Sequence, residues 1–265
     1  VPRFVPLRLE GDGYVFDPDD LRAAFTENTR AIVVNSPHNP TGKIYTDDEM
    51  RLIADLCIKH GVTAITDEVY ERLVYSADRG RPHRSLASYE GMADRTIAMS
   101  SLGKTFSMTG WKIGWTIAPP PLTAAVQAAH QFLIFTVARP LQYGAAEAMR
   151  DPGCLAWVDN LRDTLRVRRD RLFEVLNRIG FRATLPDAGY FITADHTAVS
   201  SPRGIDDDVT LCRRMTTEAG VAAIPVSALC ESPGAGRALV RFSFCKSDPV
   251  LNEGIARLER WVEGV

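Results

Sequence analysis

The sequence predicts an α/β protein with a mostly parallel sheet sandwiched by helices, followed by a smaller α+β domain at the C-terminal end. Short β-rich runs alternate with helical patterns through the first half of the 265-residue chain, which is typical of a parallel sheet covered by helices. After one long helical pattern, strands and helices follow in a less regular order. We therefore expect a large domain over residues 1–155, an interdomain helix over 156–180 and a small domain over 181–265.

Two helices of the first half have recognisable start signals. Asp17 offers an N-cap and Pro18 suits the first helical position, which predicts a helix from there to about Asn28. Residues 46–49 (TDDE) form a capping box, and Gly61 is a typical helix stop, so a second helix is predicted between them.

The remaining elements follow from apolar runs and helical periodicity. Four strands, which we expect in one sheet, are predicted at residues 31–35, 62–66, 95–100 and 114–118. Apolar positions from Val158 to Ile179 predict one long helix that ends at Gly180. In the last third we expect strands at 190–194, 221–224 and 238–244, and helices at 206–219 and 248–262.

Composition excludes several classes of partner. The chain has 31 Lys and Arg against 33 Asp and Glu, a net charge of −2, which provides no electrostatic footprint for nucleic acid or an anionic membrane. No apolar stretch is long enough to span a bilayer, and the first residues do not resemble a signal peptide. We therefore expect a cytoplasmic protein.

The cysteines and histidines predict neither disulfides nor a metal site. Five cysteines are widely spaced without a C-x-x-C pair, and the histidines have no metal-ligand spacing. We expect reduced, mostly buried thiols. Because the chain starts at Val1, within a strand-like run, we also expect a fragment that lacks an N-terminal part.

Polar side chains directly follow three of the predicted strands. They lie in residues 35–42, 67–70 and 100–105. Ligands of an open parallel sheet bind beyond the carboxyl ends of its strands, so the three segments together predict a binding site. Each segment alone would also suit a plainer role, as a turn, a helix cap or a solvated lysine.

A nucleotide site is disfavoured. Residues 103–105 (GKT) resemble the end of a P-loop, but such a loop needs a glycine five positions before Gly103. That position is Ala98, inside a predicted strand. No G-x-G-x-x-G motif follows a strand either.

Four motifs together resemble the class I and II aminotransferases, which are fold-type I enzymes dependent on pyridoxal phosphate. In matching order along the chain they are SPHNPTGK (36–43), ITDEVY (65–70), SLGKTFSMTGWKIGW (101–115) and VRFSFCK (240–246). Within this family the sequence most resembles the branch of kynurenine, methionine and N-succinyldiaminopimelate aminotransferases. The resemblance implies pyridoxal 5'-phosphate as cofactor, and an amino acid and a 2-oxo acid as substrates.

The resemblance implies a role for residues around the cofactor ring. Lys104 would hold the cofactor covalently and, once released by substrate, would carry a proton as general base and acid. Asp67 would face the pyridine nitrogen and keep it protonated, so that the ring can accept electrons. Asn39 and the Tyr70 hydroxyl would donate hydrogen bonds to the phenolic oxygen of the cofactor.

Further residues would hold the phosphate and the substrate. By resemblance, Ser101 and Lys112 would bind the cofactor phosphate, with Lys112 where related enzymes often have arginine and its bidentate fork. Arg241, in an otherwise apolar strand, would bind the substrate α-carboxylate, and Asn39 would also lie on the substrate side. A structural ion pair is the alternative for Arg241. Residues 189–191 resemble a segment that lines the substrate side.

The predicted function is therefore transfer of an amino group by a ping-pong reaction. One alternative is a pyridoxal-phosphate-dependent β-lyase that acts on cysteine conjugates, and another is a truncated remnant without catalysis. We expect the full-length protein to be a homodimer with shared active sites. The resemblance places the family's phosphate-binding turn, ring-stacking aromatic residue and lid before Val1, so activity of this fragment alone stays open, as does the identity of the substrates.

Overall fold

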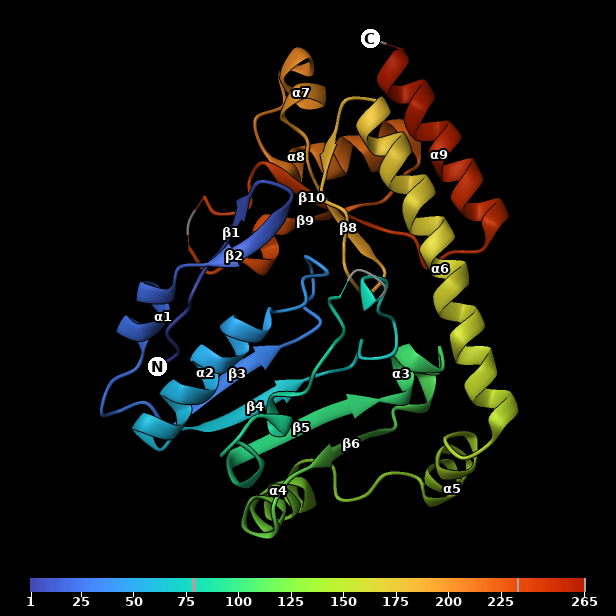
Figure 1. Ribbon diagram of the computed structural model, residues 1–265. Coiled ribbons are helices and arrows are strands. Elements are labelled where there is room, and N and C mark those ends of the chain that lie inside the picture. The colour runs from blue at the N-terminus through green and yellow to red at the C-terminus, as the bar shows by residue number, and fades with distance from the viewer. Residues whose placement is uncertain (78–79, 233, 265) are drawn as a thin grey trace. The chain divides into compact units, whose positions relative to one another are not determined.

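The computed structural model describes residues 1–77, 80–232 and 234–264 (Figure 1). The chain divides into two compact units. The first unit comprises Val1–Arg8, Val15–His38 and Lys43–Arg162, and the second comprises Leu9–Tyr14, Asn39–Gly42 and Asp163–Val265. Helices and strands occur in both units, which confirms the α/β class predicted from the sequence.

The first unit contains one four-stranded sheet with the order β3-β4-β5-β6. Its strands are β3 (Ala31–Asn35), β4 (Thr63–Asp67), β5 (Thr96–Ser101) and β6 (Gly114–Ile117). β3, β4 and β5 run parallel, and β6 pairs with β5 in the antiparallel sense. The prediction of one mostly parallel sheet is confirmed, and each strand ends within one residue of its expected limit.

Helix α2 (Asp47–His60) has the ends that its sequence signals predict. The Thr46 hydroxyl accepts a hydrogen bond from the Glu49 N–H at 3.2 Å, and the Glu49 carboxylate accepts one from the Thr46 N–H at 2.7 Å. Gly61 ends the helix in the left-handed conformation, with φ +65°.

Helix α1 (Pro18–Ala24) begins where predicted but ends earlier than the expected Asn28. The Thr29 hydroxyl accepts a hydrogen bond from the Thr26 N–H at 2.9 Å. Such a side chain competes with the helix for backbone groups, so the chain leaves the helix before these threonines.

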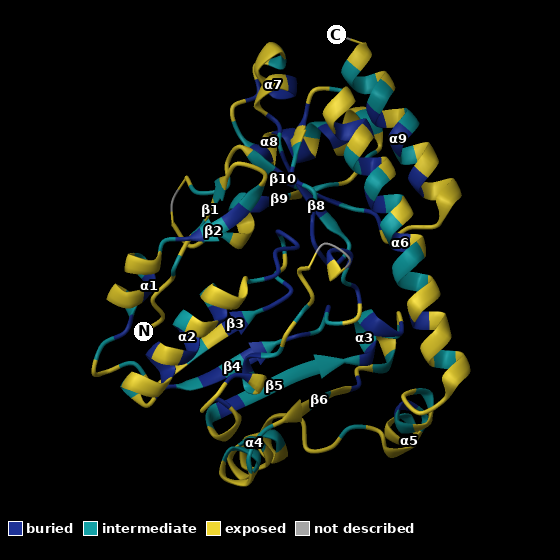
Figure 2. Cartoon of the chain, viewed as in Figure 1, coloured by how far each residue is buried: buried dark blue, intermediate teal, exposed yellow. Residues whose placement is uncertain are grey.

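Among the described residues, two apolar clusters stabilise the first unit. The larger cluster joins α1 and α2 to the sheet and includes the buried residues Leu21, Phe25, Met50, Ile53, Leu56, Val62, Ala64 and Leu86. Figure 2 shows the buried positions of α2 and β4 in dark blue. The smaller cluster contains Leu102, Phe106, Ile113, Ala145 and Val158. The larger cluster thus includes residues before and at the start of β4, whereas the smaller one begins at Leu102, directly after β5.

Several elements of the first half carry no clear sequence signal and were not predicted. They are β1 (Leu7–Glu10) and β2 (Gly13–Phe16), which pair with each other, and the helices α3 (Leu102–Thr105), α4 (Pro120–Leu133) and α5 (Arg139–Ala148). Short 3₁₀ turns occur at Leu86–Ser88, Ala93–Arg95 and Thr109–Trp111. The strand-like run expected at Val1 is wrong: residues 1–6 are not a strand, and Pro2 and Pro6 cannot donate to a ladder.

The long helix α6 (Pro152–Arg178) starts before the predicted Val158. Asp151 accounts for the earlier start, because its carboxylate accepts a hydrogen bond from the Cys154 N–H at 2.7 Å and Pro152 follows it. The boundary between the two units lies within this helix, between Arg162 and Asp163. In the described part of the chain, neither this helix nor any other is long and apolar enough to cross a membrane.

The second unit contains an antiparallel sheet with the order β7-β8-β10-β9. Its strands are β7 (Arg182–Ala183), β8 (Phe191–Asp195), β9 (Ile224–Pro225) and β10 (Leu239–Ser243). Its further helices are α7 (Thr197–Ser200), α8 (Asp208–Arg214) and α9 (Asp248–Glu263), with a π-helical turn at Met215–Ala219 and 3₁₀ turns at Ser201–Arg203 and Val226–Leu229. This is the α+β composition expected for the C-terminal part.

One strand of this unit and the predicted burial of the thiols along the chain need correction. The strand expected at 221–224 shrinks to the start of β9, because the Val221 N–H donates to the Met215 carbonyl at 3.2 Å and so closes the preceding helical turn. The thiols are free as expected, but they are not mostly buried. Only Cys57 and Cys212 are buried among the five, and Cys245, which follows β10, is exposed.

Candidate active site

The register of the parallel strands aligns polar residues at one edge of the sheet in the first unit. Asn35 pairs with Asp67 between β3 and β4, and Asp67 pairs with Met99 between β4 and β5. Ser100 and Ser101 then complete β5. The carboxyl ends of the three parallel strands therefore meet at one edge of the sheet, as predicted.

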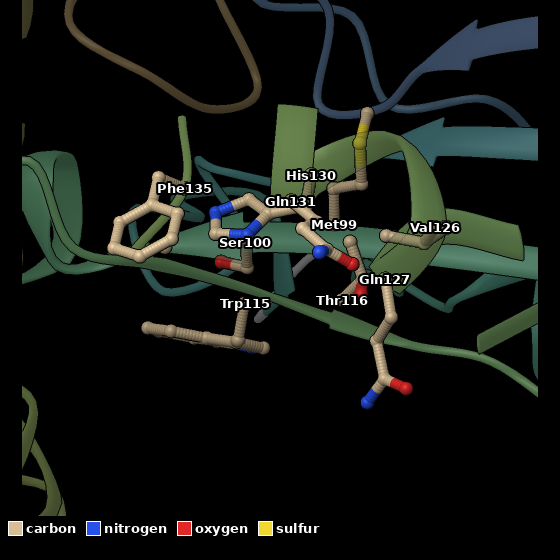
Figure 3. Close-up of a pocket in the computed structure, with 10 residues that line it drawn as sticks. Met99, Ser100, Trp115, Thr116, Val126, Gln127, His130, Gln131 and Phe135 are labelled. Atoms are coloured by element: carbon tan, nitrogen blue, oxygen red, sulfur yellow. The ribbon is translucent and has the colours of Figure 1, made fainter. Parts of the chain in front are cut away.

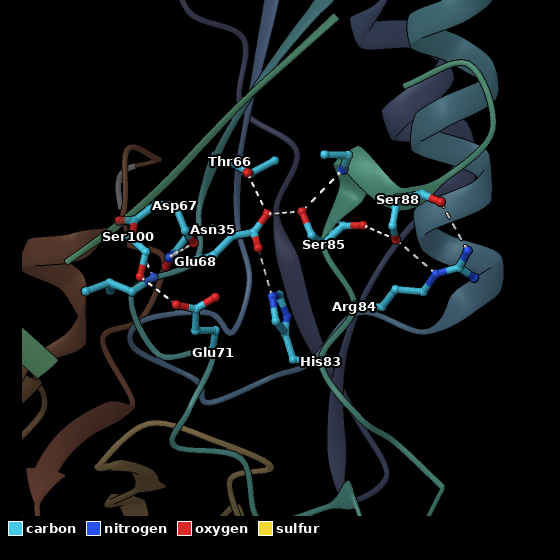
Figure 4. Close-up of polar contacts among 12 residues, drawn as sticks. Asn35, Thr66, Asp67, Glu68, Glu71, His83, Arg84, Ser85, Ser88 and Ser100 are labelled. Carbon is cyan, nitrogen blue, oxygen red and sulfur yellow. Dashed lines mark hydrogen bonds and ion pairs between the residues drawn. The ribbon is translucent and has the colours of Figure 1, made fainter. Parts of the chain in front are cut away.

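The backbone around Asp67 is held from two sides. Its carbonyl accepts hydrogen bonds from the Asn35 side-chain amide at 3.0 Å and from the Ser36 N–H at 3.1 Å (Figure 4). Its carboxylate accepts one from the Val69 N–H at 3.3 Å. Asp67 thus begins a turn, and it does not cap a helix, which was the alternative role for the segment 67–70.

Tyr70 lies in the turn that follows β4 and is only 3% exposed. The Glu71 N–H donates to the Glu68 carbonyl at 2.9 Å and closes this turn. The Ser100 hydroxyl in turn donates to the Glu71 carboxylate at 2.9 Å. The turn with Tyr70 is therefore tied to the end of β5.

Lys104 is half-buried in α3, the short helix that directly follows β5. Ser101 caps this helix, since its hydroxyl accepts a hydrogen bond from the Gly103 N–H at 3.2 Å. The chain then returns along β6, where Gly114 pairs with Ser101. The return brings Lys112, which is exposed and has φ +56°, back to the end of β5 that carries Ser101.

The second unit brings two predicted residues together. Arg241 lies on β10, and its Nη1 donates a hydrogen bond to the Asn39 side-chain oxygen at 2.8 Å. Its guanidinium carbon lies 4.0 Å from the centre of the Phe191 ring on β8. Arg241 as a whole is half-buried, and along the strand it alternates with the buried Val240 and Phe242.

Sequence reasoning missed a buried cluster behind β4. Glu68 is 5% exposed and interacts with Thr66, His83 and Ser85. The alternation of side chains along a strand could have indicated this cluster. Thr66 and Glu68 lie on either side of Asp67 in the sequence, so their side chains project to the opposite face of the sheet.

A hollow of about 530 Å³ lies between β5, β6 and α4 (Figure 3). Met99, Ser100, Trp115, Val126 and His130 are among its lining residues. None of the predicted site residues is among them, so this hollow is not the predicted site. In the described ranges, no group of three or more His, Cys, Asp or Glu side chains is placed to hold a metal ion.

The residues at the sheet edge fit pyridoxal phosphate in their chemistry. A primary amine, Lys104, suits the aldehyde of the cofactor, and a carboxylate, Asp67, suits a protonated pyridine nitrogen. The Ser101 hydroxyl and the Lys112 ammonium group suit a phosphate. All four belong to the first unit, at or just beyond the ends of β4 and β5.

The α/β fold and this set of side chains define the class of protein, a fold-type I protein suited to pyridoxal phosphate. The chain belongs to the aminotransferase class I and II family, whose model matches residues 1–258. This confirms the family predicted from the four motifs.

Individual relatives support the predicted branch. The chain is 45% identical over 263 residues to a probable N-succinyldiaminopimelate aminotransferase of Mycobacterium tuberculosis, covering 96% of this chain and 64% of the relative. It is 42% identical over 283 residues to kynurenine–oxoglutarate transaminase 3 of Mus musculus, covering 98% of this chain and 61% of that protein. The chain thus spans somewhat less than two thirds of the length of these relatives.

A solved structure confirms the fold. The N-succinyldiaminopimelate aminotransferase from Mycobacterium tuberculosis superposes with a TM-score of 0.89 at 44% identity, covering 96% of this chain and 64% of that one. An aspartate aminotransferase of Thermus thermophilus with maleate reaches a TM-score of 0.81 at 31% identity, covering 92% of this chain and 60% of that one. The fold-type I prediction is therefore correct.

Proposed function

We propose that the full-length protein is an aminotransferase that moves the amino group of an L-amino acid to a 2-oxo acid. The observation that carries this proposal is the placement of Asp67 and the β5–α3 segment with Lys104 at one sheet edge, in a chain of this family. When bound, pyridoxal phosphate would supply the electron sink for the carbanion at the substrate α-carbon.

The side chains of the first unit would hold the cofactor and move the proton. The Lys104 amine would hold the cofactor, and after release it would take the proton from the substrate α-carbon as a general base. The Asp67 carboxylate would accept the N–H of the pyridinium and keep that proton in place. The Tyr70 hydroxyl would donate to the phenolic oxygen, and Ser101 and Lys112 would bind the phosphate.

Arg241 and Asn39 would act on the substrate. A guanidinium can bind a carboxylate through two parallel hydrogen bonds, which also orients the molecule. The hydrogen bond from Arg241 to the Asn39 amide and the Phe191 ring orient the guanidinium without neutralising its charge. We assign to Arg241 the α-carboxylate that all α-amino acids share, and to Asn39 a second hydrogen bond to the phenolic oxygen of the cofactor.

The domain boundaries, the oligomeric state and the cellular compartment are part of the same proposal. We assign residues 1–155 to the cofactor-binding domain, 156–180 to the connecting helix and 181–265 to the small domain. We propose a homodimer for the full-length protein, supported by apolar side chains exposed at the end of α4, among them Phe132 (86% exposed) and Leu133 (79%). Free cysteines support a reducing compartment such as the cytoplasm.

Covalent trapping tests the central assignment. The full-length protein is mixed with pyridoxal phosphate, its absorption spectrum is recorded, and borohydride then fixes the cofactor for peptide mapping. We expect one labelled peptide containing Lys104, and no label at this position in Lys104→Ala. The control variant Lys112→Ala should bind the cofactor more weakly but still carry the label on Lys104.

Product analysis tests the reaction itself. An aminotransferase converts the amino acid into its 2-oxo acid only while a second 2-oxo acid is aminated in equal amount. Release of thiol and ammonia from cysteine conjugates without such an acceptor would instead indicate a β-lyase.

In the trapping experiment, labelling of Lys104→Ala at the wild-type level would overturn the assignment of the lysine.

A further inference from the structure

Side chains of β4 and of Glu68, the residue that directly follows it, divide between two environments. Ala64, Thr66 and Glu68 are buried, whereas Ile65 and Asp67 are half-buried. Successive side chains of a strand point to opposite faces, so Thr66 and Glu68 lie on the face opposite to Asp67. The Glu68 N–H donates to the Met99 carbonyl at 2.8 Å, which continues the pairing with β5 one residue beyond β4.

A network of hydrogen bonds surrounds the Glu68 carboxylate (Figure 4). Its Oε1 accepts from the hydroxyls of Thr66 and Ser85, each at 2.7 Å. Its Oε2 lies 3.0 Å from Nε2 of His83, and the side chains of His83 and Glu68 are only 9% and 6% exposed. The three partners come from β4 itself and from the loop that precedes the 3₁₀ turn at Leu86–Ser88.

The network keeps Glu68 ionised in spite of its burial. Burial alone raises the pKa of this carboxyl, but the hydrogen bonds from His83, Thr66 and Ser85 outweigh it and lower the pKa overall. An ionised carboxylate only accepts hydrogen bonds, so all three partners donate to it. A buried charge that loses its partners is costly, and the carboxylate is therefore held firmly in this position.

The peptide unit between Asp67 and Glu68 is held at both of its polar groups. Its carbonyl is held by Asn35 and Ser36 on the β3 side, and the next N–H, that of Glu68, is held by β5. The Glu68 side chain fixes the same peptide unit from behind the sheet. Rotation of the Asp67 backbone would have to displace the buried carboxylate.

We propose that Glu68 is a positioning residue that sets the direction of the Asp67 carboxylate. This inference rests on the proposed function, in which Asp67 binds the pyridine nitrogen of the cofactor. Glu68 contributes through the strand backbone, without contact to cofactor or substrate. Loss of its carboxylate is expected to weaken cofactor binding and to change the protonation of the ring nitrogen in the same direction as loss of Asp67.

The test compares Glu68→Ala, Glu68→Gln and Asp67→Ala in the full-length protein. Dissociation constants for pyridoxal phosphate and the absorption maximum of the bound cofactor are measured by titration. We expect Glu68→Ala to weaken binding at least tenfold and to shift the absorption maximum toward that of Asp67→Ala. Glu68→Gln keeps an oxygen acceptor for Thr66 and Ser85, so it should restore most of the affinity.

A matched control separates positioning from general loss of stability. Asp208 of the second unit is likewise a buried carboxylate, 1% exposed, and it accepts hydrogen bonds from the N–H and hydroxyl of Ser227 at 2.7 and 2.9 Å. Asp208→Asn should lower the midpoint of thermal unfolding without changing the cofactor dissociation constant or spectrum.

The possible results decide between the two proposals. Equal affinity and an unchanged spectrum in Glu68→Ala would overturn the positioning role, as would an equal loss of affinity in Asp208→Asn. If Glu68→Ala does not fold, Ser85→Ala replaces it, with a several-fold weaker affinity expected and wild-type affinity contradicting the proposal. No binding by the wild-type protein would instead overturn the proposed function on which this inference rests.

Discussion

The Arg241 guanidinium donates a hydrogen bond from Nη1 to the Oδ1 atom of Asn39 at 2.8 Å, although 202 positions separate the two residues in the sequence. Asn39 belongs to the short segment Asn39–Gly42, which groups with β8 and β10 in the second unit. Its amide oxygen orients the cation without cancelling its charge. This hydrogen bond thus joins a residue of the SPHNPTGK motif to a residue of the VRFSFCK motif.

Replacing Arg241 should weaken substrate binding in a graded way. A charge-assisted bidentate pair contributes about 1.5–3 kcal/mol, so we expect Arg241→Ala to raise the KM for the amino acid roughly 10- to 100-fold. Arg241→Lys keeps the charge but loses the bidentate fork, so its KM should lie between those of the wild-type protein and Arg241→Ala. Steady-state kinetics with one amino acid and one 2-oxo acid measure the effect. The exposed Arg213 of α8 supplies the control, since Arg213→Ala should leave KM unchanged.

Replacing Asp67 should reduce cofactor affinity and rate together. Removing one partner of a paired buried charge costs roughly 3–5 kcal/mol, and Asp67 is half-buried, so the lower end of this range is expected for Asp67→Ala. Titration with pyridoxal phosphate and the rate at saturating cofactor give the two values. The exposed Asp94 precedes β5, and Asp94→Ala should change neither. An unchanged rate in Asp67→Ala would refute the assignment.

Gly42 should not tolerate a side chain. It has φ +70°, and an added Cβ would lie 2.3 Å from the Pro186 Cβ and 2.7 Å from the Ala188 carbonyl oxygen. Gly61 has a similar φ of +65° but open space around a Cβ, so Gly61→Ala measures the backbone strain alone, about 1 kcal/mol. We expect a clearly larger loss of unfolding free energy in Gly42→Ala, measured by urea denaturation. Equal losses in the two variants would contradict this account.

His38 should make the protein less stable as the pH falls. Burial, with a contribution from the Lys43 charge, lowers its pKa from 6.5 to about 4. Between these values the unfolded chain binds a proton and the folded protein does not, so the free energy of unfolding decreases toward acid. We expect a loss on the order of 2 kcal/mol between pH 7 and pH 5.

Urea denaturation of His38→Gln at both pH values isolates this effect. The variant should show a smaller difference between the two conditions than the wild-type protein. The lowered pKa of Glu68 adds its own loss of stability only below the ordinary carboxyl pKa of 4.5, so it contributes little in this range. The same pH dependence in both proteins would show that His38 is not responsible.

Local sequence signals predicted the elements that have clear capping residues. They failed for elements whose limits depend on contacts with other parts of the structure. The capping box at Thr46 and the stop at Gly61 define α2 because both act within a single turn of backbone. The strand expected near Val221 was lost to a hydrogen bond that closes a helical turn, and α4 and α5 have no cap formed by a side chain. Such outcomes depend on competition between contacts that no short window of sequence contains.

The class of fold, the family and the types of residue in the candidate site follow from the amino-acid sequence alone, because turn chemistry, strand periodicity and short motifs are local properties of the chain. Which of these residues meet depends on contacts between distant segments. The pairing of Asn35 with Asp67 depends on the register of two strands, and the contact of Asn39 with Arg241 depends on packing across most of the chain. The Glu68 network likewise depends on the fold, because it forms where the loop with His83 and Ser85 packs against β4. A buried charge is stable only where donors from distant parts of the chain surround it.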